Sequence, residues 1–394
     1  MNYILFDDST WNNLKPLSFT RPVAEIRVGI MTIKEKWEKY LNTTCSYYTE
    51  TYLRKKYPLK TDKKNILINS SVLPDEILLK KILQLCEGQA LVCEKNLIAF
   101  YCNHEDISGI DFSDINQFNI IEHKSDILKI NELWDIFSLN AVAIDRDFKF
   151  LTNGRVSEKP GRTNQVLGDN FFIEKGAKLE CCVLNSITGP VYIGKDTEIM
   201  EGSAIRGPFA LCNNSTLKLN SKIYGATTIG PHAKVGGEIN NSVIFGYSNK
   251  AHDGFLGQSV IGEWCNIGAD SNNSNLKNNY AEVKLWDYNT KRFKKTGLQF
   301  CGLIMADHSK CAINTMFNTG TVVGVSSNIF GSGFPRNFIP DFSWGGAQGF
   351  TSFDLKKVFE IAEIVMARRS VPFTDIEKEI LVHIFEITEE YRKY

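Results

Sequence analysis

The chain has 394 residues, and 45 Lys plus Arg balance 45 Asp plus Glu. A length above about 300 residues favours more than one domain, and a net charge of zero argues against general nucleic-acid binding or attachment to an anionic membrane. The first residues do not resemble a signal peptide and no apolar run is long enough to span a bilayer, so we expect a cytoplasmic protein. Ten cysteines without a CxxC pair indicate reduced thiols.

Residues 1–150 alternate short apolar runs with segments of helical period, which predicts an α/β domain. The predicted strands are 3–6, 65–68, 89–93 and 97–101, and the predicted helices are 28–41, 77–86 and 130–137. This alternation predicts a parallel sheet that binds ligands at the carboxyl ends of its strands. Asp7 and Asp8 would lie at that edge, with Lys15 and Arg21 near it.

The periodicity lapses from Asn140 to Gly168, and we place a linker at 151–168. From 169 to 335 the chain has a different period. An aliphatic residue recurs at every sixth position from Ile193 to Val235, and a small residue follows most of these by four positions. A helix repeats at about 3.6 and a strand at 2, so a period of six predicts a solenoid in which three short strands close each triangular coil.

Residues 336–394 predict a C-terminal loop and two helices that cap the open end of the solenoid. The loop, Pro340 to Gly349, contains glycine and aromatic residues. Two amphipathic helices are expected at 353–369 and 374–391, and Thr374 with Glu377 has the pattern of a capping box.

One part of the solenoid resembles a known family. The segments K-A-H-D-G-F-L-G (250–257), I-G-E-W-C-N-I-G-A (261–269) and N-N-S-N (272–275) resemble the acetyltransferase half of the bifunctional N-acetylglucosamine-1-phosphate uridyltransferase (GlmU) family, without a gap from Glu238 to Asn275. The resemblance implies a left-handed parallel β-helix and a homotrimer that binds acetyl-CoA between neighbouring solenoids. It also implies acetyl transfer to an amino sugar phosphate, with glucosamine-1-phosphate as the expected acceptor.

The resemblance also implies roles for individual residues. His252 matches the catalytic base, and a histidine near its ordinary pKa suits the removal of a proton from an amine that attacks a thioester. The implied substrate-binding residues are Glu238, Asn240, Lys250, Phe255, Asn266 and Asn275, and the implied acetyl-CoA-binding residues are Ala269, Ala306 and Val325.

Several residues depart from the family pattern and leave the acceptor open. Asp270 replaces a glycine, Phe255 lacks a tyrosine hydroxyl, and Asn240 stands in place of a phosphate-binding lysine. A lysine-rich insert, 276–299, follows the Asn turn and is expected to be a solvated loop or a phosphate-binding segment. Arg336 is our counterpart for the arginine that engages the cofactor phosphate in the family.

The N-terminal part resembles the sugar nucleotidyltransferases through Lys15-Pro16-Leu17, which implies nucleotide binding through Asp7, Asp8, Lys15 and Arg21, with Mg²⁺ as a further expectation. The Gly-rich phosphate loop of that superfamily is absent, and Trp11 is too bulky for a backbone cradle around a triphosphate. Asn69 also stands where an Asp metal ligand is expected, and amides bind Mg²⁺ less well than carboxylates. Either other residues bind the nucleotide or this domain has lost the activity.

We therefore interpret the chain as a sugar-nucleotide biosynthesis enzyme that transfers acetyl groups, and that also forms UDP-N-acetylglucosamine by uridylyl transfer if its N-terminal domain is active. Its partners would be small-molecule substrates and further copies of itself. Two alternatives remain: a nucleotidyltransferase whose solenoid is only structural, and a non-catalytic scaffold that binds sugar nucleotides.

Overall fold

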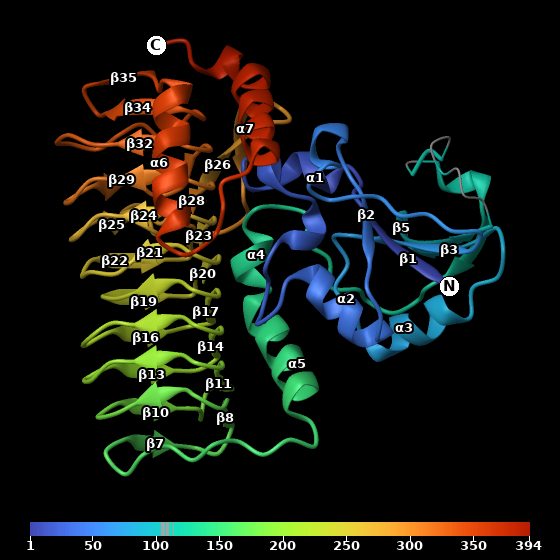
Figure 1. The fold of residues 1–394 in the computed structure, drawn as a ribbon, viewed down its shortest axis with the longest axis horizontal. Coiled ribbons are helices and arrows are strands. Elements are labelled where there is room, and N and C mark those ends of the chain that lie inside the picture. The colour runs from blue at the N-terminus through green and yellow to red at the C-terminus, as the bar shows by residue number, and fades with distance from the viewer. Residues whose placement is uncertain (104–106, 108–109, 113) are drawn as a thin grey trace. The chain divides into compact units, whose positions relative to one another are not determined.

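The computed structural model describes residues 1–394 except 104–106, 108–109 and 113. The chain forms two compact units (Figure 1). The N-terminal unit contains Met1–Ile26 and Met31–Glu132, and the solenoid unit contains Arg27–Ile30 and Leu133–Tyr394. Each unit is described separately below.

The N-terminal unit is built on one mixed six-stranded sheet. In spatial order its strands are β2 (Ser46–Tyr48), β1 (Asn2–Phe6), β3 (Asn65–Asn69), β5 (Asn96–Cys102), β4 (Gln89–Cys93) and β6 (Asn119–Glu122). β1 is parallel to β3, as predicted, and to β2, a strand that was not predicted, but β5 is antiparallel to both of its neighbours. The expectation of a wholly parallel sheet is wrong because only two residues join β4 to β5, and so short a connection allows only antiparallel pairing.

Side chains cap the N-termini of the two longer helices of this unit, α2 (Ile33–Leu41) and α3 (Glu76–Leu83). The unit also contains α1 (Thr10–Asn13) and the short 3-10 turns η1 (Leu17–Thr20), η2 (Val23–Glu25), η3 (Thr51–Leu53) and η4 (Ile115–Gln117). α2 starts five residues later than predicted because Thr32 and Glu35 form a capping box at its N-terminus. In α3 the side chain of Asp75 accepts from the Leu78 N–H.

The solenoid consists of three sheets whose strands run parallel from coil to coil, and most coils contribute one strand to each sheet, which confirms the predicted triangular coil. The first face is β7 (Gln165–Leu167), β10 (Val183–Asn185), β13 (Ala204–Arg206), β16 (Lys222–Tyr224), β19 (Glu238–Asn240) and β22 (Phe255–Gly257). The second face is β8 (Phe171–Ile173), β11 (Val191–Ile193), β14 (Phe209–Leu211), β17 (Thr227–Ile229), β20 (Val243–Ile244), β23 (Val260–Ile261), β28 (Leu303–Met305), β31 (Thr321–Val323) and β33 (Phe338–Ile339). The third face is β9 (Lys178–Leu179), β12 (Glu198–Ile199), β15 (Thr216–Leu217), β18 (Lys234–Val235), β21 (Asn249–Lys250), β24 (Asn266–Ile267), β29 (Lys310–Cys311), β32 (Asn328–Ile329), β34 (Ser343–Gly346) and the antiparallel β35 (Gly349–Ser352). β25 (Asn272–Asn273) pairs separately with β30 (Met316–Phe317).

The six-residue period has a direct physical basis. The predicted aliphatic residues from Ile193 to Val235 are buried and stack on one another in the core of the solenoid. The small residue four positions later closes the corner. The hydroxyls of Ser203, Ser215 and Ser221 each donate to the carbonyl three residues before them, so a polar group can be buried at the corner with its hydrogen bond satisfied.

Helices α4 (Asp135–Ser138) and α5 (Asn140–Thr152) precede the first coil, so part of the segment where the periodicity lapses is helical. Figure 1 shows α5 beside the second face of the solenoid. The buried Asn140 side chain donates to the Ala226 carbonyl at 2.8 Å and accepts from the Gly29 N–H at 2.7 Å. Asp147 accepts from the Ile30 N–H at 2.8 Å, so α5 fastens the segment 27–30 to the coils.

The coils continue into the region predicted as a loop, because residues 343–352 form the β34–β35 hairpin. The two predicted C-terminal helices are present as α6 (Leu355–Ala367) and α7 (Asp375–Ile387), followed by η5 (Glu389–Tyr391), and the Thr374–Glu377 capping box is confirmed. Figure 1 shows α6 along the third face. No helix in the described parts of the chain has the length and apolar character needed to span a bilayer.

The lysine-rich insert forms the antiparallel hairpin β26 (Lys284–Asp287) and β27 (Arg292–Lys295), not an open loop. Trp286 of this hairpin stacks on Phe338 at 4.3 Å between ring centroids. Lys291 and Lys295 pair with Glu390 and Glu282 at 2.8 and 3.5 Å. These contacts give the insert a packing role at the end of the solenoid.

Candidate functional site

His252 lies on the corner between the third and first faces, two residues after β21 and three before β22. Its side chain is exposed in the single chain. The corner of the coil below is unusually short, because the buried Ile239 follows Val235 by four residues where the period requires six. Only Gly236 and Gly237 span that corner.

These two glycines allow the His252 turn to lie directly on the coil below. A β-carbon on Gly236 would be 2.7 Å from the Ala251 carbonyl oxygen, and one on Gly237 would be 2.8 Å from that of Gly254 and 2.9 Å from that of His252. Gly237 also has a φ of +80°, which other residues adopt at a cost. The short corner therefore sets the height of the His252 turn, and only glycine fits there.

Lys250 is not on the surface with the substrate-binding candidates, because its side chain points into the solenoid core and is only 2% exposed. Its ammonium donates to the carbonyl oxygens of His252 at 2.6 Å, Asp253 at 3.1 Å and Gly236 at 3.3 Å. Burial lowers the pKa of Lys250 to about 8. The residue therefore acts on the backbone of the His252 turn and cannot bind a substrate at the surface.

Three of the predicted substrate residues, Glu238, Asn240 and Phe255, share the first face, and Asn275 lies beside it. Glu238 and Asn240 on β19 pair with Phe255 and Gly257 on β22. The Tyr224 hydroxyl donates to Glu238 at 2.6 Å. A β-carbon on Gly257 would be 2.6 Å from both the amide nitrogen of Asn275 and the Phe255 ring, so the absence of a side chain at Gly257 makes room for these two groups.

The remaining candidates lie elsewhere. Asn266 is exposed on the third face, beside Asn249 and Lys310. Asn249 and Asn266 pair in adjacent coils. His252 and Ala269 each lie three residues after one of these two residues. Ala269 is therefore one coil above His252, on the same corner. Ala306 and Val325 follow strands of the second face and are fully buried at a different corner. The structure therefore does not bring Ala306 and Val325 together with Ala269.

In the N-terminal unit, Asp7 and Asp8 follow β1 at the predicted sheet edge. Asp7 accepts from the Val23 N–H at 3.0 Å and from the Thr49 hydroxyl at 2.5 Å, and burial raises its pKa to about 7. Asp8 accepts from the Asn69 amide at 2.8 Å and from the Lys129 ammonium at 3.0 Å. Burial opposes the charge of Asp8, but the positive charge of Lys129 and these hydrogen bonds outweigh it and lower the pKa.

These residues do not fit a Mg²⁺ ion. Asn69 is 1% exposed, its oxygen accepts from the Ser71 N–H and hydroxyl, and its nitrogen donates to Asp8 and to the Leu97 carbonyl. Lys129 already supplies the positive charge beside Asp8. Within the described ranges, no group of three or more His, Cys, Asp or Glu residues is placed to hold a metal. The geometry assigns the neutralising role at this edge to a lysine.

The other two nucleotide-binding candidates have different surroundings. The Lys15 ammonium donates to Asn12 at 2.8 Å and lies 4.6 Å from the centre of a Trp11 ring. Arg21 is 4% exposed, and its carbonyl accepts from the Trp11 indole at 3.2 Å. Trp11 is a core residue of α1, so a helical turn replaces the phosphate loop that the sequence lacks.

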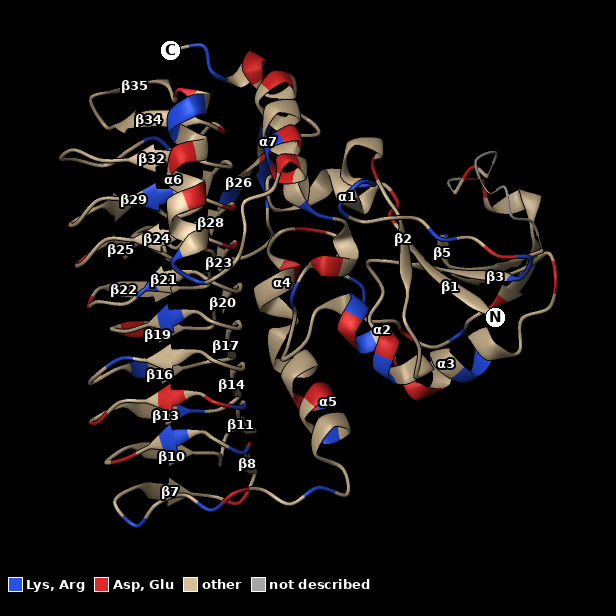
Figure 2. Cartoon of the chain, viewed as in Figure 1, with Lys and Arg blue, Asp and Glu red and all other residues tan. Residues whose placement is uncertain are grey.

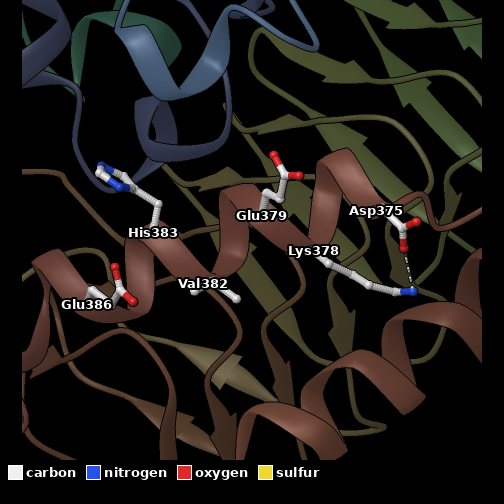
Figure 3. Close-up of a pocket in the computed structure, with 6 residues that line it drawn as sticks. All are labelled: Asp375, Lys378, Glu379, Val382, His383 and Glu386. Atoms are coloured by element: carbon white, nitrogen blue, oxygen red, sulfur yellow. Dashed lines mark hydrogen bonds and ion pairs between the residues drawn. The ribbon is translucent and has the colours of Figure 1, made fainter.

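Two grooves of the solenoid unit lie outside the candidate site. One runs along a single face of α7, where Lys378 pairs with Asp375 and His383 lies one turn from Glu379 (Figure 3). The other is lined by Arg336, Lys393 and the β34–β35 hairpin, and the Arg336 guanidinium lies between the Phe350 and Tyr394 rings at 5.2 and 5.3 Å. Figure 2 shows Lys and Arg mixed with Asp and Glu along the coils.

Residues 3–156 match a family model described as sugar nucleotidyl transferase. The expected resemblance is confirmed. The chain is 27% identical over 218 residues to a bifunctional sugar-1-phosphate nucleotidylyltransferase/acetyltransferase of Sulfurisphaera tokodaii, with 55% of this chain and 47% of that protein aligned. It is 28% identical over 194 residues to a bifunctional protein GlmU of Methanocaldococcus jannaschii, with 48% and 40% aligned. The chain spans about half the length of these curated relatives.

Among solved structures, the UDP-N-acetylglucosamine acyltransferase of Francisella novicida aligns with 58% of this chain and 87% of its own, at 12% identity and a TM-score of 0.30. At that score the likeness is loose, and the fold assignment rests on the strand pairing described above. The α/β unit, the solenoid and the terminal helices agree with the predicted fold class.

The sequence interpretation missed three groups around the candidate sites. Lys250 falls on an inward-facing position, six residues after Ile244, and that phase was the signal of its burial. The Gly236–Gly237 pair marks the first break in the period. Lys129 has no local signal, because its partner Asp8 is 121 residues away in the sequence.

Proposed function

We propose that the solenoid unit transfers an acetyl group from acetyl-CoA to the amino group of a sugar phosphate, with glucosamine-1-phosphate as acceptor. The observation that carries the proposal is the position of His252 at the edge of the face that holds Glu238, Asn240 and Phe255, with Asn275 beside that face. An exposed imidazole next to carboxylate, amide and aromatic side chains suits an amino sugar, whose hydroxyls need hydrogen bonds and whose ring needs an apolar surface.

In this proposal His252 takes a proton from the sugar amine as the nitrogen attacks the thioester carbonyl. The tetrahedral intermediate then collapses, the carbon–sulfur bond breaks, and the leaving thiolate takes up the proton that His252 removed from the amine. Glu238 accepts hydrogen bonds from sugar hydroxyls, and the Asn275 amide donates to the acetyl or sugar oxygens. The rigid coils supply positioning, which accounts for much of the rate enhancement in such a transfer.

The His252 corner also supports a proposed homotrimer in which acetyl-CoA binds between neighbouring solenoids. Leu219 and Ile313 lie on this corner, below and above His252, and are 57% and 66% exposed. Apolar side chains so exposed are suited to burial against another copy of the chain. Ala269 lies between His252 and Ile313 and would line the acyl-donor path, and Arg336 is proposed to meet the cofactor phosphate.

We propose nucleotidyl transfer to form UDP-N-acetylglucosamine as the function of the N-terminal unit, because residues 3–156 match the sugar nucleotidyl transferase model. The proposed functional domains are 1–150 and 169–335, and Asp7, Asp8, Lys15 and Arg21 remain the nucleotide-binding candidates. If the solenoid is only structural, nucleotidyl transfer would be the activity of the whole chain.

The first test is thiol release from acetyl-CoA in the presence of glucosamine-1-phosphate. We expect His252→Ala to lower the rate by about 10² or more, the scale of a lost general base. His232→Ala is the matched control, because His232 stacks on Tyr247 at another corner, 4.8 Å between ring centroids. Equal rates for the wild type and His252→Ala would reject the proposed base, and uridylyl transfer would then be the activity to assay.

A further inference from the structure

Lys250 occupies a position of the solenoid that is otherwise apolar. In the consecutive strands β15, β18, β21 and β24 of the third face, the inward residues are Leu217, Val235, Lys250 and Ile267. A lysine in such a core is costly unless its charge is met by hydrogen bonds. Three backbone carbonyls meet this charge, and two of them belong to the His252 turn.

The hydrogen bonds between coils show what the ammonium does. In regular coils a corner N–H donates to a carbonyl of the coil below, as Asn220 does to Glu201 and Asn314 does to Ala269. In each case the acceptor is the residue just before the one that lies directly below the donor. Because Asn266 pairs with Asn249, Asp270 lies above Asp253, and its N–H should donate to the His252 carbonyl. It donates instead to the next carbonyl, that of Asp253, at 3.1 Å.

The His252 carbonyl accepts from Lys250 in place of the missing ladder bond. The ladder has therefore slipped by one residue at this coil, and the lysine ammonium fills the gap from inside the core. A slip of one residue changes the direction in which the turn presents its side chains, because each residue of a corner points a different way.

We propose that Lys250 is a positioning residue that holds the slipped turn in the conformation that presents His252 to the acceptor amine. The proposal rests on the proposed function of His252. Lys250 does not touch substrate, because its side chain is buried; it acts on His252 through the backbone. Gly236 and Gly237 complete the arrangement by leaving room below the turn.

The solenoid provides a matched comparison in Lys310. Its ammonium also donates to a backbone carbonyl two residues away, that of His308, at 2.8 Å, and burial likewise lowers its pKa to about 8. Lys310 belongs to β29, and the turn it contacts lies at a different corner from His252. Replacing Lys310, which is partly buried on the outer side of β29, therefore removes a lysine with a similar backbone contact without altering the His252 turn.

The experiment compares Lys250→Met and Lys310→Met in the full chain. We expect Lys250→Met to remain folded, since an apolar side chain suits the core, and to lower kcat for acetyl transfer by about tenfold or more, the effect of lost orientation, with the KM for the acceptor changed less than about twofold. Amide hydrogen exchange in 251–255 and at Asp270 should accelerate. Lys310→Met should leave both the kinetics and this exchange as in the wild type.

Other outcomes are decisive as well. Wild-type kcat and exchange in Lys250→Met would overturn the proposal, and so would equal losses of activity in both variants that track their melting temperatures. Should Lys250→Met fail to fold, Lys250→Gln keeps one donor in the core and is measured in the same way. If the wild type transfers no acetyl group, the proposed function fails, and the exchange of 251–255 still decides whether Lys250 holds the turn.

Discussion

Gly237 lies so close to the His252 turn that a β-carbon on it would be 2.9 Å from the His252 carbonyl oxygen. The contact joins the shortened corner between β18 and β19, where the inward residues Val235 and Ile239 are only four positions apart, to the turn above it. A glycine at this place therefore determines how the candidate base is presented.

Replacing Gly237 with alanine should destabilise the solenoid unit by about 3 kcal/mol, since a left-handed backbone position and a backbone clash add together. Gly331→Ala is the control, because Gly331 has a φ of +97° and nothing within 4 Å of the added carbon. That variant should lose only about 1 kcal/mol. Urea unfolding measures both values, and equal losses would show that the Gly237 clash is relieved without cost.

The stability of the solenoid unit should increase as the pH rises from about 8 to about 10.5. Burial lowers the pKa of Lys250 from 10.5 to about 8, so within this window the unfolded chain binds more protons than the folded chain, and the free energy of unfolding rises with pH. The gain is at most about 3 kcal/mol. Lys250→Met should remove this part of the slope in urea unfolding curves, and an unchanged slope would mean that Lys250 keeps its ordinary pKa.

Asp7 should make the free energy of unfolding of the N-terminal unit fall with rising pH, at lower pH values than those at which Lys250 acts. The pKa of Asp7 is raised by burial from 3.8 to about 7, so the folded state binds more protons between these values and stability falls as the pH rises from about 4 to about 7. Asp7→Asn cannot ionise and should be more stable than the wild type at pH 8, by up to about 4 kcal/mol. Unfolding of both proteins at pH 4 and pH 8 checks this, and a constant difference between them would contradict it.

Lys129 should exclude divalent metal from the N-terminal unit. Titration with Mn²⁺ alone, followed by electron paramagnetic resonance, should show no binding that depends on Asp8 in the wild type. Lys129→Met leaves the Asp8 carboxylate without its cation and should create such binding, since a buried carboxylate attracts another cation. Lys149→Met, which breaks the exposed pair with Asp145, should not. Binding in the wild type that Asp8→Asn abolishes would refute the assignment.

The sequence predicted those features of the structure that depend on residues close to one another in the chain. The period of six identified the inward residues from Ile193 to Val235 because each coil repeats the same local geometry. Thr374 and Glu377 predicted the start of α7 because both residues of a capping box lie within one helical turn. Trp11 predicted the absence of the phosphate loop from the sequence alone, because a bulky side chain in this segment leaves no room for the backbone to surround a phosphate.

Tertiary structure decided the rest, since burial and partner choice depend on residues that are distant in sequence. The phase of the repeat points Lys250 inward, but only the stacking of β21 between β18 and β24 shows which backbone carbonyls meet its ammonium. Lys129 meets Asp8 across 121 residues, and this pairing places a positive charge beside the carboxylate. The sequence alone determined the coil, its inward residues and the resemblance around His252; through-space packing decided which charges are buried and which turn they hold.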